Sequence, residues 1–356
     1  MDRRKFITGS LLVTGGGLLA PTMAKAESKA FASGTWPDRI IKPKKLSKGD
    51  TIGLITPSSA ISRGSFESTL ENMEALGFKV KYSDNMRVRK GFLAGTDQQR
   101  LDDLHTMFAD PSVDGIFCAR GGYGAGRLLP GIDYSLIASN PKAFIGYSDI
   151  TALHFAIFNK TGLVTFHGPV GASNFTDYTA DSFEDTLIKG KGKIKIEQAK
   201  EDRERQEDYI QIYSITDGVA KGELVGGNLS LVSSLTGTPF DLDFTNKLVF
   251  LEEVGESPYR IDRMLTQLLL AGKLQAAKGI VLGVFNDCDE KDTDPDFGDK
   301  TSLRETLAER LGSLSIPVLY GMSFGHVSNI ATLPMGISAE LDTYKQSLTL
   351  LEESVL

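Results

Sequence analysis

The chain has 356 residues, of which 41% are hydrophobic and 24% are charged, the composition of an ordinary globular protein. Its formal net charge of −7 argues against a nucleic-acid partner, because such a partner requires a concentrated basic surface. The length is sufficient for two domains.

The N-terminus has the pattern of a bacterial twin-arginine export signal. Arg3 and Arg4 precede a weakly apolar, glycine-rich stretch over residues 7–19, and a small-x-small cleavage pattern occupies residues 24–26. The apolar stretch is too short and too polar to span a bilayer. We expect a mature periplasmic protein without a membrane anchor that begins near Glu27; the alternative is a disordered N-terminus.

Apolar strand patterns alternate with helical patterns through the first half of the chain. Short apolar runs at residues 51–56, 113–119, 143–147 and 163–166 predict buried strands. Buried strands separated by helices are typical of a mainly parallel sheet that is covered on both faces.

Capping patterns predict where two of these helices begin. Ser65 is expected to cap a helix that Gly77 ends. Thr96 and Gln99 form a capping-box pattern that opens a second amphipathic helix.

The character of the chain changes in residues 181–211, where charged side chains dominate and a domain junction is expected. Strands are predicted after it at residues 209–215, 247–251, 279–285 and 316–320, and further strands from Met335. A glycine-rich turn is expected at residues 226–228. Helices are predicted at residues 258–270 and after the capping box of Ser302 and Glu305.

Together these patterns predict an α/β protein of two domains with a cleft between them. The expected parts are a signal at residues 1–26, an extension at 27–45, an N-terminal parallel-sheet domain at 46–180, the junction at 181–211, and a C-terminal domain of mixed strands and helices at 212–356.

The most informative local pattern surrounds Ser148. An apolar strand ends just before this serine, and a helical pattern begins directly after it. A serine on such a tight turn exposes its hydroxyl at the carboxyl edge of the sheet, as in a nucleophile elbow, although the closing glycine of G-x-S-x-G is missing. The alternative is that Ser148 only caps the helix.

A serine nucleophile requires a base, and the chain has four histidines. His326 lies in a glycine-flanked loop after a predicted strand and is the first candidate. His167 ends another predicted strand and is the second. His105 and His154 lie within helical patterns and are expected to be structural.

A carboxylate should orient the chosen histidine. Glu252 and Glu253 follow the apolar run of residues 247–251, which would place two acids at a strand edge. The alternative is a solvated acidic pair that opens a loop.

Five motifs resemble, in the same order, those of the LD-carboxypeptidases, a family of serine peptidases that includes the microcin-immunity peptidases. They are residues 120–124 (RGGYG), 146–151 (GYSDIT), 226–228 (GGN), 251–256 (LEEVGE) together with 259–263 (YRIDR), and 325–326 (GH), and the resemblance spans roughly residues 41–350.

The resemblance implies a Ser-Glu-His triad. Ser148 matches the family's nucleophile, His326 its base and Glu252 its orienting carboxylate. The oxyanion hole would be formed by backbone N–H groups of Asp149 and of the Gly121-Gly122 turn, which agrees with the need for amides that face the developing negative charge.

Further positions match the family's substrate cleft. Arg260 matches a position near the substrate carboxylate, although a surface arginine paired with a nearby acid is an equal alternative. Asn228 and Glu256 are expected to line the same cleft, and His167 matches a recurrent segment of its wall.

The activity implied by the resemblance is cleavage between an L-centre residue and a terminal D-amino acid, with release of D-alanine from muropeptide tetrapeptides. Neither a metal nor a cofactor is implied, and a homodimer is expected. The alternatives are a peptidase acting on aminoacyl-nucleotide antibiotics and a periplasmic peptide-binding protein.

Two other patterns lack the residues that their sites require. The glycines of residues 121–126 do not fit a dinucleotide loop, and the acidic run at 292–296 lacks the glycine and glutamate of a calcium loop. Cys118 lies in an apolar strand pattern, so we expect a small buried residue; the sequence leaves open whether it pairs with Cys288.

Overall fold

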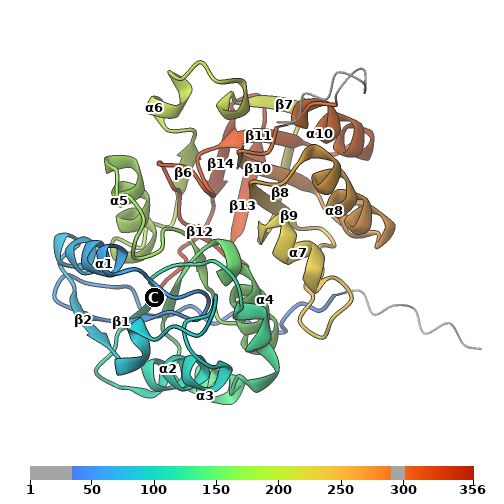
Figure 1. Cartoon of the computed structure of the whole chain (residues 1–356). Helices are drawn as coiled ribbons and strands as arrows, with labels where there is room; N and C mark the ends of the chain where they lie inside the picture. The colour runs from blue at the N-terminus through green and yellow to red at the C-terminus, as the bar shows by residue number, and fades with distance from the viewer. Residues whose placement is uncertain (1–33, 290–300) are drawn as a thin grey trace, which may run out of the picture. The chain divides into compact units, whose positions relative to one another are not determined.

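Two β-sheets make up the centre of the computed structural model, which describes residues 34–289 and 301–356 (Figure 1). The predicted export signal and the acidic run at 292–296 lie outside the described residues. Within the described ranges, no helix has the length and apolar character needed to cross a membrane.

The first sheet confirms the predicted parallel arrangement and adds one strand from the far end of the chain. Its order is β12-β5-β4-β3-β1-β2, and only β12 runs antiparallel to its neighbour. The strands are β1 (Thr51–Ile55), β2 (Lys79–Tyr82), β3 (Gly115–Cys118), β4 (Ala143–Gly146), β5 (Phe166–His167) and β12 (Leu333–Pro334).

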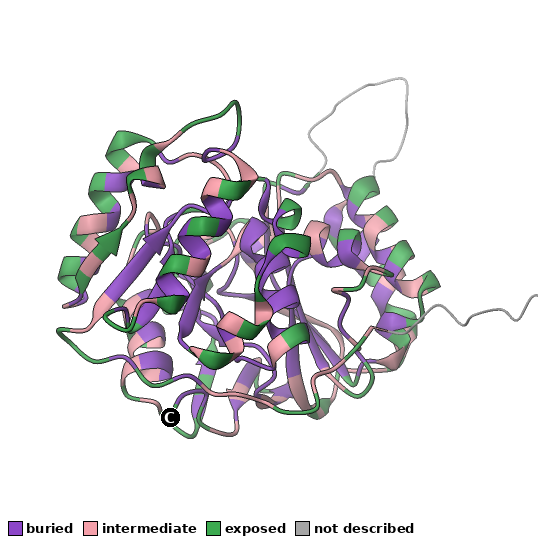
Figure 2. Cartoon of the chain, turned by 90° about the horizontal axis from the view of Figure 1, so that it is seen from below, coloured by how far each residue is buried: buried purple, intermediate pink, exposed green. Residues whose placement is uncertain are grey.

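Both faces of this sheet are covered, because successive strand residues pack into different cores. Ile116 and Phe144 belong to one core, and Phe117 and Ile145 to the other. The first core is closed by α2 (Asp97–Ala109), α3 (Tyr134–Ser139) and α4 (Thr151–Thr161), and the second by α1 (Arg63–Ala75) and α5 (Asp177–Phe183). Figure 2 shows these strands as buried and the outer helix faces as exposed.

The second sheet is mixed, with the order β6-β14-β13-β8-β9-β10-β11-β7. The four strands from β8 to β11 are parallel, and the others are antiparallel. They are β6 (Ile194–Glu197), β7 (Tyr213–Thr216), β8 (Val219–Asn228), β9 (Leu248–Val254), β10 (Gly279–Asn286), β11 (Val318–Met322), β13 (Ser338–Asp342) and β14 (Ser347–Leu350).

Helices of the second half pack their apolar faces on this sheet. Figure 1 shows α7, α8 and α10 along one side of it. The helices are α7 (Leu229–Leu235), α8 (Pro258–Leu270), α9 (Lys273–Ala276) and α10 (Leu303–Leu311), and α6 (Lys200–Arg203) lies within the predicted junction. Short 3-10 helices occur at Asp84–Arg87, Ala125–Arg127, Leu129–Gly131, Ser148–Ile150, Asp208–Ile210 and Gly312–Leu314, and a π-helical turn at Glu184–Ile188.

Two local predictions were wrong. The first helix begins one turn earlier than expected: Ser62 is the N-cap, and Ser65 instead donates its backbone N–H to the Ser62 hydroxyl. Gly226 and Gly227 do not form a turn but lie inside β8. A Cβ on Gly226 would lie 1.8 Å from the backbone oxygen of Phe250, so glycine allows β8 and β9 to pack closely.

Other predictions hold with shifted limits. The capping box of Thr96 and Gln99 opens α2 as expected. Cys118 is buried in β3, and both it and Cys288 are free thiols. The two glutamates predicted to follow a strand lie inside β9, which is longer than its apolar run because these acids have partners within the protein.

Candidate active site

Ser148 lies on a strained turn between β4 and α4. Its φ is +65°, in the left-handed region that residues other than glycine rarely adopt. The N-cap of the 3-10 turn that begins here is Tyr147, and it makes no side-chain capping bond. The Ser148 hydroxyl contacts His326 instead, which is the nucleophile-elbow arrangement and not the helix cap.

Three side chains from distant parts of the chain form one line of hydrogen bonds. His326 Nδ1 is 2.8 Å from Glu252 Oε2, and His326 Nε2 is 3.0 Å from Ser148 Oγ. Because an ionised carboxylate only accepts, Nδ1 carries the proton and Nε2 accepts from the serine hydroxyl. This is the arrangement of a nucleophile, a base and an orienting acid.

Burial and charge set the protonation of this line. Burial opposes the charged form of His326, but the carboxylate of Glu252 outweighs burial and raises the pKa of the imidazole. Glu252 is fully buried; burial raises its pKa, while the charge and hydrogen bond of His326 outweigh that effect and lower it. The pair therefore favours an ionised acid that stabilises the imidazolium once a proton arrives.

A glycine loop approaches the serine from β3. A Cβ built on Gly121 would lie 3.0 Å from Ser148 Cβ and 3.2 Å from its Oγ. Gly122 has φ +115°, and a Cβ there would lie 2.4 Å from Ser59 Oγ. Since side chains are excluded at both positions, the loop presents main chain to the serine hydroxyl.

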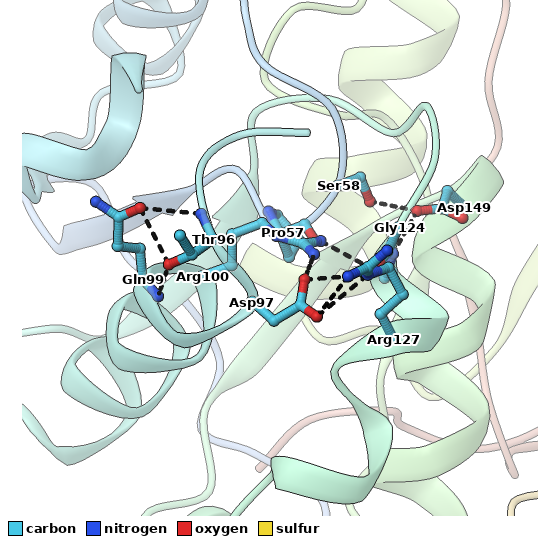
Figure 3. A network of polar contacts seen from close by, with 10 residues as sticks. Pro57, Ser58, Thr96, Asp97, Gln99, Arg100, Gly124, Arg127 and Asp149 are labelled. Atoms are coloured by element: carbon cyan, nitrogen blue, oxygen red, sulfur yellow. Dashed lines mark hydrogen bonds and ion pairs between the residues drawn. The ribbon is translucent and has the colours of Figure 1, made fainter. Parts of the chain in front are cut away.

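A buried polar network holds this loop, and sequence reasoning missed it (Figure 3). Asp149 accepts hydrogen bonds from the Ser58 hydroxyl at 2.6 Å and from the Ala125 backbone N–H at 2.8 Å. Arg100 on α2, which is 1% exposed, donates to the carbonyls of Pro57 and of Gly124, the latter at 2.9 Å. A lone arginine beside the apolar face of α2 was the signal available in the sequence.

The loop that carries His326 is held by a residue of the predicted junction. Asp202 on α6 is 2% exposed and accepts hydrogen bonds from Ser323 Oγ at 2.6 Å and Asn329 Nδ2 at 2.9 Å. Ser323 and Asn329 lie on either side of His326 in the loop after β11. A polar run around residue 202 gave no indication that one of its acids is buried.

The remaining histidines do not contact Ser148. His154 donates from Nε2 to the Gly146 carbonyl at 2.8 Å, and His105 accepts the Asp133 backbone N–H at 2.9 Å. His167 is buried against aromatic rings, its ring nitrogens have no hydrogen-bond partner among the described residues, and burial lowers its pKa to about 4.

The three predicted substrate contacts have partners within the protein. Arg260 is half-exposed and donates to Glu256 at 3.2 Å, as its alternative interpretation expected. Asn228 is buried, donates to Glu253 Oε1 at 2.9 Å and caps α7 with its side-chain oxygen. Substrate binding by these residues stays a prediction.

Comparison with known proteins places both halves of the chain in one family. Residues 52–168 match the LD-carboxypeptidase N-terminal domain and residues 221–341 the LD-carboxypeptidase C-terminal domain. The chain is 42% identical over 306 residues to the "Probable murein peptide carboxypeptidase" of Bacillus subtilis (strain 168), with coverage of 86% of this chain and 93% of that protein.

Solved structures show the same fold. The MccF-like protein from Bacillus anthracis str. Ames superimposes with a TM-score of 0.78 at 33% identity, covering 88% of this chain and all of that one. A muramoyltetrapeptide carboxypeptidase from Oxalobacter formigenes gives a TM-score of 0.71 at 30% identity, covering 84% and 97%. With these matches and a serine, a histidine and a glutamate in hydrogen-bond contact, the chain belongs to the LD-carboxypeptidase family of serine peptidases.

Proposed function

We propose that this enzyme releases the terminal D-alanine from peptidoglycan tetrapeptides, with Ser148 as nucleophile, His326 as base and Glu252 as orienting acid. The observation that carries the proposal is the unbroken hydrogen-bond line from Glu252 through His326 to the strained serine. The resemblance to murein peptide carboxypeptidases supports the substrate class.

In the first half of the reaction, Ser148 Oγ attacks the carbonyl carbon of the L-centre residue while its proton passes to His326 Nε2. The backbone amides of Asp149, Gly121 and Gly122 would stabilise the oxyanion, and Glu252 the imidazolium. The carbon–nitrogen bond then breaks, and the proton on Nε2 passes to the departing amine of D-alanine.

In the second half, water attacks the acyl ester while His326 takes its proton. The ester bond breaks, and the proton returns from His326 to the Ser148 oxygen, which restores the resting enzyme. An exopeptidase also has to recognise a free carboxylate, and Arg260 would do so by exchanging Glu256 for the substrate.

The decisive experiment measures D-alanine release from free tetrapeptide and from disaccharide-tetrapeptide. The chain from Glu27 onward should release D-alanine, and Ser148→Ala should not, while circular dichroism shows both folded. Release by the alanine variant would remove Ser148 from the mechanism, and no release by the folded wild-type chain would exclude the substrate.

A second candidate substrate is an aminoacyl-nucleotide, favoured by the structural likeness to an MccF-like protein. Hydrolysis of aspartyl sulfamoyl adenosine, a molecule bound in one MccF structure, measured beside D-alanine release from the tetrapeptide, separates the two. Faster hydrolysis of the aspartyl amide than of the tetrapeptide would favour it, and tight peptide binding without turnover would indicate a binding protein.

We also propose that the enzyme is exported by the twin-arginine route and acts in the periplasm as a homodimer. The paired arginines and the cleavage pattern within residues 1–26 support export. Replacing Arg3 and Arg4 by lysine should retain the enzyme in the cytoplasm, as cell fractionation would show; unchanged periplasmic recovery would contradict the route.

A further inference from the structure

Two large aromatic side chains lie exposed next to the glycine loop of the active site. Phe92 is 63% exposed and Tyr123 58%. Their ring centroids are 5.4 Å apart with an interplanar angle of 67°, so each ring supports the edge of the other. Contiguous exposed apolar surface rimmed by polar residues is a feature of ligand-binding sites.

A hollow of about 500 Å³ adjoins this pair. Phe92 and Leu93 form its apolar wall, and Asp97, Gln98 and Arg127 bring hydrogen-bonding groups to it. An apolar wall with a few convergent polar groups is the usual composition of a small-molecule site.

The hollow and the aromatic pair are held in place by the same polar network that holds the glycine loop. Arg127 contacts Asp97 through two nitrogens, at 3.1 Å and 2.9 Å, and Asp97 also accepts from the buried Arg100 at 2.7 Å. The Tyr123 backbone N–H donates to Ser59 Oγ at 3.1 Å. The surface is therefore preorganised, although its rings are exposed.

The position of the pair relative to Ser148 fits one part of the proposed substrate. Tyr123 follows Gly121 by two residues, and Gly121 lies directly against the serine. In a disaccharide-tetrapeptide, the cleaved D-alanine is at one end of the stem and the sugar is attached at the other, three residues from the cut bond. Three extended residues span about 10 Å, comparable with the distance that two residues and a tyrosine side chain cover.

We propose that Phe92, Tyr123 and the adjoining hollow bind a sugar ring of the glycan in glycan-linked stem peptides. This inference rests on the proposed muropeptide activity and adds a specificity site to it. The C–H face of a pyranose ring would pack on an aromatic ring, while its hydroxyl and acetamido groups would bond to Asp97, Gln98 and Arg127.

The test compares kcat/KM for disaccharide-tetrapeptide with that for free tetrapeptide in wild type, Phe92→Ala and Tyr123→Ala. We expect the ratio of the two values to fall about fivefold to tenfold in both variants, through KM for the glycan-linked substrate. Tyr344→Ala is the matched control, because Tyr344 is an aromatic residue that is 71% exposed in the turn between β13 and β14 and should leave the ratio unchanged.

The outcomes separate this proposal from the proposed function. An unchanged ratio in Phe92→Ala, with activity on free tetrapeptide present, would overturn the sugar site alone. A changed molar mass in light scattering together with an unchanged ratio would identify the patch as an interface between two copies of the chain. Absence of D-alanine release from both substrates in the wild-type enzyme would instead overturn the proposed function.

Discussion

The turn at Ser148 exposes the serine hydroxyl at a conformational cost. A non-glycine residue in the left-handed region is less stable by about 1 kcal/mol than one in an ordinary conformation. The hydroxyl is nevertheless directed to His326 at 3.0 Å, a contact that a relaxed helix-capping serine would not make. Strain at this residue is therefore part of how the proposed nucleophile is positioned.

This strain predicts an unusual order of stabilities. Ser148→Gly should be more stable than Ser148→Ala by about 1 kcal/mol, because glycine adopts positive φ without a Cβ clash. Urea unfolding of both inactive variants measures the difference. At Ser65, inside α1, the order should reverse, with alanine more stable than glycine. Equal stabilities at position 148 would show that the turn is unstrained.

The acid limb of the pH profile should follow His326. As the proposed base, His326 works in its neutral form, so kcat/KM should fall as the pH falls through the pKa of His326, which Glu252 raises. Glu252→Gln removes that negative charge and should shift the midpoint to lower pH, while the maximal rate falls on the order of 10⁴-fold. A midpoint that stays or rises would contradict this arrangement; Glu67→Gln on α1 is the control.

The close approach of Gly121 predicts a selective loss of turnover. Gly121→Ala would place a Cβ 3.0 Å from Ser148 Cβ, so the serine or the loop has to shift. We expect kcat to fall by about 10- to 100-fold, with a smaller change in KM. Gly126→Ala is the matched control, since nothing lies within 4 Å of its added Cβ. Similar kinetics for both variants would argue against the tight contact.

At the scale of elements, a short helix supports the loop that carries His326, the proposed base. α6 brings Asp202 against Ser323 and Asn329, and the backbone N–H of Ala199 donates to Ser323 Oγ at 2.8 Å. The segment predicted as a junction thus holds the His326 loop in place and also supplies β6 to the second sheet. The support of the His326 loop depends on one buried acid, Asp202, in a segment that is otherwise polar.

Asp202→Ala should loosen the His326 loop. Two hydrogen bonds to a buried carboxylate are lost, so we expect the free energy of unfolding to fall by about 1–3 kcal/mol and kcat to fall more than KM rises. Asp202→Asn should recover part of the activity, because its side-chain oxygen still accepts from Ser323. Glu201→Ala, at the exposed neighbouring position, should change neither quantity. Normal kcat in Asp202→Ala would exclude a positioning role.

At the scale of the whole molecule, the two sheets depend on each other. The serine follows a strand of the first sheet, and Glu252 and the His326 loop belong to the second. β12 returns from the C-terminal half to pair with β5, and one hydrophobic core contains residues of both sheets. The hydrogen-bond line from Glu252 through His326 to Ser148 therefore exists only when both halves are folded together.

This shared core predicts a single cooperative unfolding transition. Trp36, the one tryptophan, packs on Phe158 of α4 and under the Lys247 ammonium beside β9, so its fluorescence reports on both halves. In urea, the midpoints from Trp36 fluorescence and from far-UV circular dichroism should coincide. Two separated transitions would show that the halves unfold independently.

Much of the fold was predictable because its signals are local. The capping boxes of Thr96 and Ser302 open helices where expected, since each involves a residue only three positions away. Strand limits were less predictable: β5 is shorter than its apolar run, and β8 includes the glycines expected to turn. In each case, pairing with a neighbouring strand determined where the strand begins and ends.

By itself, the sequence determined the alternation of buried strands and capped helices and the tight strand-to-helix turn at Ser148, because these features depend on neighbouring residues. Tertiary structure decided that His326 and not His167 contacts Ser148. His326 and Ser148 are 178 positions apart and meet only when the two sheets pack together. It also decided that Asp202 is buried and that β12 joins the first sheet. Hydrogen bonding across such separations depends on the packed core, which no local pattern specifies.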